Sequence, residues 1–305
     1  MTEENQSEER HPEEQILQEG DPNTTGHVWD GIKEFDNPMP RWWLWTFYLT
    51  IAWGVGYTIL YPAWPLVNGA TEGLLGWSTR GEVAAEIAEF DEMNAPLRER
   101  IEAVELAALN PDDNPDLYNY AIQGGGAVFA NSCSQCHGRG ADGAVGYPNL
   151  LDDDWLWGGS IDEIYYTISH GIRNDDDLDS RYSEMTPFGE VLSDEEITSV
   201  VQYVRQISDQ EADATLAAAG EEVYLSSCSA CHGVNGAGER FLGAPNLTDA
   251  IWLYGGSEEV IEATVRDGRF GVMPPFSAAA SDAGRLNEAA LRSVAVYVHS
   301  LGGGE

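Results

Sequence analysis

Two short stretches decide how this chain is organised: Cys133-Ser134-Gln135-Cys136-His137 and Cys228-Ser229-Ala230-Cys231-His232, 95 residues apart. In each, two cysteines are separated by two residues and a histidine follows directly. This C-x-x-C-H pattern is the attachment signature of c-type haem. One helical turn presents both thiols along one porphyrin edge for thioether bonding, and the adjacent histidine ligates the iron. We therefore predict two covalent haem c groups, bound by Cys133, Cys136, Cys228 and Cys231, with His137 and His232 as proximal iron ligands.

Other uses of paired cysteines are a zinc knuckle, a redox dithiol and a structural disulfide. All four cysteines of the chain lie in the two motifs, and each motif is followed by glycine. A thioredoxin-like dithiol does not need the histidine, and a four-ligand zinc site would have to join two segments far apart in sequence. The pattern therefore favours haem and, with it, electron transfer.

The two motifs belong to an internal repeat. Pro148-Asn149-Leu150 matches Pro245-Asn246-Leu247, and a Trp-Leu pair, a Gly-Gly-Ser run and further residues recur with the same spacing of 97. Each copy reads as helix, haem motif, loop, short helix, methionine-bearing loop and helix. The repeat predicts an all-α fold with two tandem class I cytochrome c domains, at 116–212 and 213–305. Gly126 and Gly220 are expected to let the first and last helices of each domain cross closely.

Each copy also offers a methionine as sixth iron ligand, which is common in electron-transfer cytochromes c. Met185 and Met273 occupy equivalent places, each shortly before a proline that stiffens its loop. We expect each methionine to serve its own domain, although two packed domains could exchange these loops. His170 is a competitor for Met185, because the first copy carries an insertion at 173–183.

A second pair of positions bears on the proximal histidines. Pro148 and Pro245 stand where a backbone carbonyl could accept the Nδ1–H of the neighbouring histidine, a bond that orients a ligating imidazole. A simple turn proline is the other interpretation.

Residues 42–61, WWLWTFYLTIAWGVGYTILY, contain no charge. As a helix they would extend about 30 Å, the thickness of a hydrocarbon core. Tryptophan and tyrosine gather at both ends, as at membrane interfaces. A buried core helix would have a polar face, and a signal peptide would begin earlier and be shorter. We predict one N-terminal transmembrane helix, within an anchor at 27–65.

The basic residues Lys33 and Arg41 precede this segment, and the next one after it is Arg80. This favours a single-pass protein with a cytoplasmic N-terminus. Haem attachment in bacteria takes place outside the cytoplasm, so we expect an inner-membrane protein with periplasmic haem domains.

Charge and composition set further limits. Acidic residues outnumber basic ones 52 to 15, for a formal net charge of −37. Phosphates would be repelled, so nucleic acid is excluded as a partner. The acidity suits a saline habitat or a basic protein partner. Residues 1–26 are polar and acidic and are predicted to be disordered, and 66–115 are predicted to be a connector with one or two short helices.

These features together resemble a known family. Trp29-Asp30-Gly31-Ile32, then Asn37-Pro38-Met39-Pro40-Arg41 with the aromatic run that follows, and Tyr61-Pro62-Ala63-Trp64-Pro65 precede two haem domains. This arrangement resembles CcoP, also called FixP, the dihaem subunit of cbb3-type cytochrome c oxidase. The resemblance covers about residues 26–303. Departures are Met-Thr-Pro in place of Met-Pro at the first ligand loop, and the unusual acidity.

The resemblance implies a role and partners. Electrons would come from a soluble or membrane-anchored donor cytochrome c and pass through the two haems to a monohaem subunit. From there they would reach the catalytic haem–copper subunit, which reduces oxygen and pumps protons. The resemblance implies that the four motif cysteines bind haem, and that His137, His232, Met185 and Met273 are axial ligands.

Two other functions compete with this one. A free-standing membrane-anchored dihaem shuttle would need no specific pattern around its anchor. A dihaem peroxidase would need an open iron, whereas both haems here have a candidate sixth ligand. We predict no catalytic residues in this chain, only a part in an oxidoreductase complex.

Overall fold

The computed structural model describes residues 23–30, 32–277 and 286–305, and divides the chain into a unit ending at Phe90 and a second from Asp91 to Glu305. The first unit begins with strands β1 (Thr24–Trp29) and β2 (Ile32–Phe35), which pair antiparallel. Helix α1 (Arg41–Leu60) follows, and then a small hairpin of β3 (Pro65–Leu66) and β4 (Gly69–Ala70). The predicted disordered tail at 1–26 lies largely outside the described residues, and its last three positions belong to β1.

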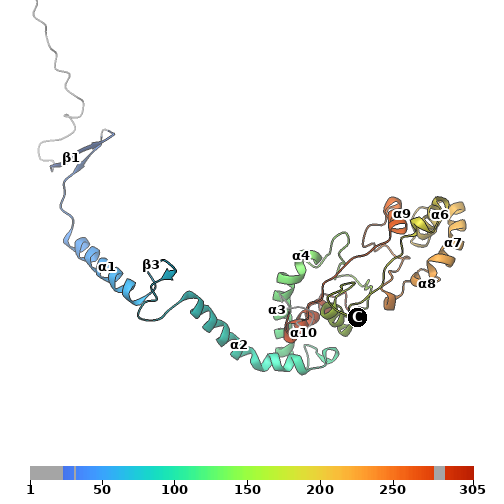
Figure 1. The fold of residues 1–305 in the computed structure, drawn as a ribbon, viewed down its shortest axis with the longest axis horizontal. Coiled ribbons are helices and arrows are strands. Elements are labelled where there is room, and N and C mark those ends of the chain that lie inside the picture. Colours follow the sequence, from blue (N-terminus) through green and yellow to red (C-terminus); the bar gives the residue numbers. More distant parts are fainter. Residues whose placement is uncertain (1–22, 31, 278–285) are drawn as a thin grey trace, which may run out of the picture. The chain divides into compact units, whose positions relative to one another are not determined.

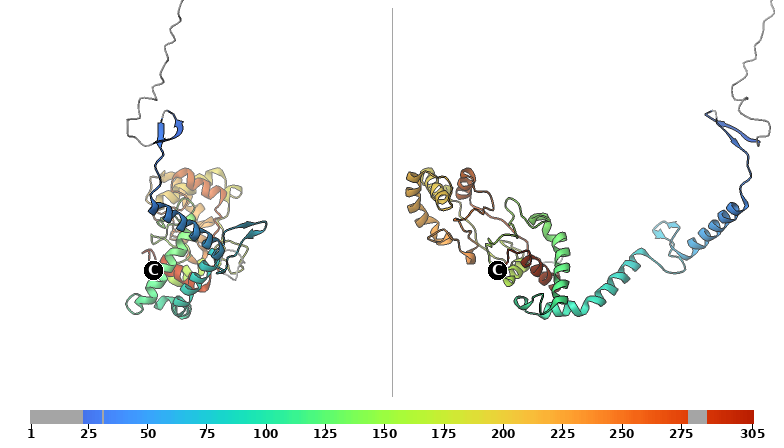
Figure 2. Two further views of the ribbon diagram at one scale, coloured as in Figure 1. Left: turned by 90° about the vertical axis from the view of Figure 1, so that its left-hand side faces the viewer. Right: turned by 180° about the vertical axis from the view of Figure 1, so that it is seen from behind.

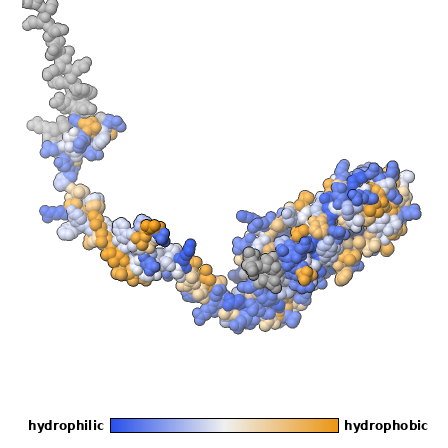
Figure 3. Space-filling view, viewed as in Figure 1, coloured by the Kyte–Doolittle hydropathy of each residue, from blue (hydrophilic) through white to orange (hydrophobic). Residues whose placement is uncertain are grey.

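Helix α1 corresponds to the segment predicted to cross the membrane, shifted by one residue. It starts directly after Pro40, whose fixed φ and missing N–H suit a helix start. None of its side chains is buried, and Figure 3 shows apolar surface along it. Among the helices of the described part of the chain, none is both long enough and apolar enough to cross a membrane.

The connector contains one long helix, where one or two short helices were expected. Helix α2 (Thr79–Ala103) carries Pro96 in its interior and passes from the first unit into the second. Its last turns pack into the second unit, where Ile101 is fully buried, and the 3-10 turn η2 (Leu106–Ala108) follows it.

The second unit contains the two repeats, each built as predicted from helices around one motif. In the first copy these are α3 (Pro115–Val128), α4 (Ser134–His137), α5 (Ile161–His170) and α6 (Asp194–Ile207), with the π-turn η3 (Phe129–Cys133) before the motif and the 3-10 turn η4 (Phe188–Glu190) before α6. In the second they are α7 (Ala214–Ser227), α8 (Ser229–His232), α9 (Glu258–Asp267) and α10 (Glu288–His299), with the 3-10 turn η5 (Arg240–Leu242) between α8 and α9.

The last helices of the two copies are exchanged. Helix α10 packs on α3 and α5, although it belongs to the second copy, and α6 packs on α7 and α9. Figure 1 shows α10 beside α3 and, apart from them, α6 beside α7 and α9; the rear view in Figure 2 shows the same grouping. The second unit therefore has two lobes: lobe A with α3, α4, α5 and α10, and lobe B with α6, α7, α8 and α9.

The predicted domains at 116–212 and 213–305 follow the sequence repeat, and the packing of the last helices crosses between them. The core around Phe129, Ile164 and Ile168 is completed by Leu291 and Val294 of the last helix. The core around Tyr224, Ile261 and Val265 is completed by residues of α6, namely Ile197, Val200, Val201 and Val204. Apolar burial is the main driving force for such packing, and each exchanged helix buries its apolar residues in the core of the other copy.

Glycines allow the exchanged helices to cross at backbone distance. A Cβ atom added at Gly125 of α3 would lie 2.2 Å from the carbonyl oxygen of Ser293 on α10. At Gly220 of α7 it would lie 2.0 Å from that of Ser199 on α6. A close crossing at Gly220 was expected, but its partner is α6 of the first copy rather than the last helix of its own copy. At α3 the expected glycine was Gly126, which faces the Tyr297 ring, whereas the backbone contact is made by its neighbour Gly125.

Candidate functional site: two cysteine–histidine motifs

Both motifs sit at the end of a helical segment and present two thiols and an imidazole. Helices α4 and α8 each run from the residue after the first cysteine to the histidine, and a glycine with positive φ ends them. In the part of the chain that the structure describes, the four cysteines are free thiols. Cys136 and Cys231 are exposed, whereas Cys133 and Cys228 lie deeper. Burial, assisted by the second cysteine of each motif, raises the pKa of Cys133 and of Cys228 to about 11.

The histidines are oriented by the carbonyls expected from the sequence. His137 Nδ1 lies 3.0 Å from the carbonyl oxygen of Pro148, and His232 Nδ1 lies 3.0 Å from that of Pro245. A carbonyl accepts, so Nδ1 carries the proton and Nε2 keeps a lone pair for a metal. Burial lowers the pKa of both histidines, with these hydrogen bonds opposing it, which favours the neutral form that ligates iron. The prediction of these carbonyl contacts is confirmed.

The methionines lie in the opposite lobes from those expected. Met273 packs against the core that contains Cys133, Phe129 and Ile168. Met185 packs against the core that contains Cys228 and Tyr224. Each methionine belongs to the segment that precedes an exchanged helix, so the methionine loop and the helix after it lie in the same opposite lobe. Met273 therefore lies in the lobe of the first motif and Met185 in the lobe of the second, whereas we expected each methionine in the lobe of its own copy.

Two isolated β-bridges mark where the exchanged segments enter the opposite lobe. Ile172 bridges to Met273, and Met185 bridges to Arg269, both antiparallel. At each bridge the neighbouring glycine has positive φ, and a Cβ on it would lie 2.4 Å from a methionine carbonyl: Gly171 against Met273, and Gly268 against Met185. A side chain there would push the methionine strand away, so these glycines keep both strands in place.

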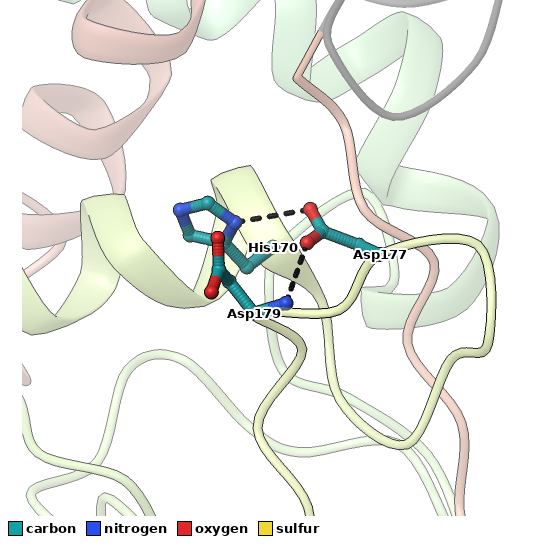
Figure 4. Close-up of side chains that lie close together, drawn as sticks. All are labelled: His170, Asp177 and Asp179. Carbon is teal, nitrogen blue, oxygen red and sulfur yellow. Dashed lines mark hydrogen bonds and ion pairs between the residues drawn. The ribbon is translucent and has the colours of Figure 1, made fainter.

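His170, the alternative ligand, has partners in its own copy. Its Nδ1 lies 3.0 Å from a carboxylate oxygen of Asp177, and its ring packs on that of Tyr166 with centroids 4.5 Å apart. Figure 4 shows the imidazole facing Asp177, while Asp179 lies beside the ring and donates its backbone N–H to Asp177. The insertion at 173–183 thus supplies Asp177 as a partner of His170, whereas Tyr166 belongs to the same helix as His170.

The donor set fits a covalently attached haem. Each lobe brings together two free thiols, an imidazole whose Nδ1 is bonded to a carbonyl, and a partly buried thioether, which are the groups that bind haem c.

Comparison with known proteins extends this picture. Residues 21–68 match the family model described as the N-terminal domain of cytochrome oxidase-cbb3, FixP, and residues 121–204 and 215–298 match that of cytochrome c oxidase, cbb3-type, subunit III. The CcoP subunit of the cbb3-type cytochrome c oxidase of Cereibacter sphaeroides is 58% identical, over 94% of this chain and 97% of its own. CcoP of Rhodobacter capsulatus is 52% identical (92% and 96%), and FixP of Azorhizobium caulinodans 46% (94% and 95%). The chain therefore belongs to the CcoP/FixP family of cbb3-type cytochrome c oxidase subunits.

Proposed function

We propose that this chain carries two haem c groups and passes electrons from a donor cytochrome c, soluble or membrane-anchored, to a monohaem subunit of a cbb3-type oxidase and then to its catalytic haem–copper subunit. The observation that carries the proposal is the pair of lobes, each with one complete set of haem ligands, in a member of this family. With a histidine and a methionine available for each iron, neither iron would keep an open position for a substrate. It serves electron transfer without a reaction of its own.

The structure supports a crossed ligand set. Cys133 and Cys136 would hold one haem with His137 and Met273, and Cys228 and Cys231 would hold the other with His232 and Met185. Haem c supplies a one-electron carrier at each site. Thioether ligation favours the reduced iron and raises its potential, while the carbonyls of Pro148 and Pro245 fix the imidazole planes.

We also propose that residues 42–61 anchor the chain in the bacterial inner membrane, with a cytoplasmic N-terminus and periplasmic haem lobes. Support comes from the absence of charge in this segment, the lack of any buried residue in α1, and aromatic residues at both of its ends. Tryptophan and tyrosine favour the membrane interface although they lower the mean hydropathy of a helix.

Affinity purification of the intact chain from membranes in mild detergent tests the function. We expect two haem c groups per chain in a pyridine haemochrome assay, together with oxygen-reducing companion subunits. A chain that emerges alone would refute the assembly, and any other haem count would refute the ligand sets.

The crossed ligation has its own test. In a full-length chain with Cys133→Ser and Cys136→Ser, only the second motif can attach haem. Met185→Ala in that background should abolish the absorption band of methionine-ligated ferric haem, and Met273→Ala should leave it unchanged. The opposite result would restore the pairing within each copy.

A further inference from the structure

Two aromatic side chains join the lobes at equivalent positions of the repeat. Trp157 and Tyr254 are 97 residues apart, and so are Gly146 and Gly243. A Cβ on Gly243 would lie 2.3 Å from the Trp157 ring, and a Cβ on Gly146 would lie 3.3 Å from the Tyr254 ring. Each aromatic residue of one copy thus rests on a glycine of the other. The contact is reciprocal, as is the exchange of the methionine segments.

The two glycines belong to the loops that orient the proximal histidines. Gly243 precedes Pro245 by two residues, and Pro245 accepts the Nδ1–H of His232. Gly146 stands in the same relation to Pro148 and His137. Gly146 also donates its backbone N–H to the Leu253 carbonyl at 2.8 Å, next to Tyr254. Each aromatic ring therefore contacts a glycine that lies two residues before the proline whose carbonyl orients the histidine.

The aromatic rings are themselves fixed on their other side. Arg181 lies over the Trp157 ring, 5.4 Å from its centroid, and Arg269 lies over the Tyr254 ring at 4.5 Å. Both arginines belong to the bridged strands: Arg181 pairs with Ile172, which pairs with Met273, and Arg269 pairs with Met185. Trp157 is 8% exposed, so it is a rigid support rather than a mobile surface group.

From this arrangement we propose that Trp157 and Tyr254 are positioning residues for the haem sites of the opposite lobes. Trp157 holds the loop of Pro245 and so the imidazole of His232, and Tyr254 holds the loop of Pro148 and so the imidazole of His137. Each haem would thus depend on the other copy for its methionine and for the orientation of its histidine. The proposal rests on the proposed function, because it assumes that both histidines ligate haem.

The test compares Trp157→Ala with Tyr254→Ala in the full-length dihaem chain. Electron paramagnetic resonance of the ferric protein and a redox titration report each haem separately. The signals are assigned with full-length single-haem chains, Cys133→Ser/Cys136→Ser and Cys228→Ser/Cys231→Ser. We expect Trp157→Ala to broaden the low-spin signal and shift the midpoint potential of the haem on His232, leaving the haem on His137 unchanged. Tyr254→Ala should do the reverse.

Conservative variants separate positioning from folding. Trp157→Phe and Tyr254→Phe keep a ring on the glycine and should restore the wild-type signals. An effect on the haem of the residue's own copy, an equal effect on both haems, or no effect would overturn the proposal. The haemochrome count, measured on the same samples, shows separately whether two haems are attached, so a failure of the proposed function would be recognised as such.

Discussion

The crossing of α3 and α10 at Gly125 gives the sharpest prediction about the exchanged fold. In Gly125→Ala the new Cβ would lie 2.2 Å from the Ser293 carbonyl oxygen and 2.7 Å from the Tyr297 Cβ. No rotamer change relieves a backbone contact, so the two helices must separate by about 1 Å. Overpacking of this kind costs about 3 kcal/mol, and the higher helix propensity of alanine returns about 1 kcal/mol.

We therefore expect Gly125→Ala to lose about 2 kcal/mol of unfolding free energy, a fall in melting temperature of roughly 4–8 °C for a unit of this size. Gly124→Ala is the matched control, because its Cβ would meet nothing closer than 3.9 Å and gains the same propensity. The assay is thermal unfolding of the haem-loaded full-length chain, followed by circular dichroism. Equal melting of Gly125→Ala and wild type, or an equal loss in the control, would refute the crossing. Since α10 carries the Met273 segment, the absorption of methionine-ligated haem should weaken on the His137 side alone.

Three further outcomes are expected. Burial and the nearby Asp249 raise the pKa of Asp154 to about 6, so the folded state binds more protons than the unfolded state between about pH 4 and 6, and the free energy of unfolding falls as pH rises through that range. Asp154→Asn should therefore be more stable than wild type above pH 6, by roughly 1 kcal/mol after solvent screening. At pH 4 it should be no more stable, as measured by urea denaturation. Ser193 caps α6 in a reciprocal capping box with Glu196, so Ser193→Ala should lower the free energy of unfolding by about 1 kcal/mol in the same assay; an unchanged urea midpoint would contradict the cap. The chain carries a net charge of −37, so electron delivery by a basic donor cytochrome should slow as ionic strength rises. Stopped-flow rates that do not change with salt would contradict electrostatic attraction of the donor.

Much of the local structure could be predicted from the sequence. The start and end of α1 were expected within one residue, because the uncharged run at 42–61 marks its length. The contacts of His137 and His232 with proline carbonyls followed from the repeat itself, since both copies place a proline at equivalent positions. Features that depend on residues close together in the sequence can be predicted in this way.

The exchange of the methionine segments could not be predicted by the same means. Apolar residues of α6 and α10 recur at matching places of the two copies, so the sequence pattern does not say which core each helix completes. The glycine of the α3 crossing did have a sequence signal, because Gly125 precedes Gly220 by 95 residues, the spacing of the haem motifs, whereas Gly126 does not. The sequence shows only that Trp157 and Tyr254 occupy equivalent positions of the repeat, because their spacing says nothing about which residues they contact.

The placement of α10 in lobe A has a consequence for how the protein is made. Lobe A begins with residues synthesised early, yet its core and its methionine come from the last part of the chain. A nascent chain that ends shortly after α6 would contain Cys133 and Cys136 but would lack Met273, the sixth ligand under the proposed crossed ligation. If that proposal holds, the first haem site is completed only after the C-terminus has been synthesised, and a chain truncated after α6 leaves both lobes without part of their helices.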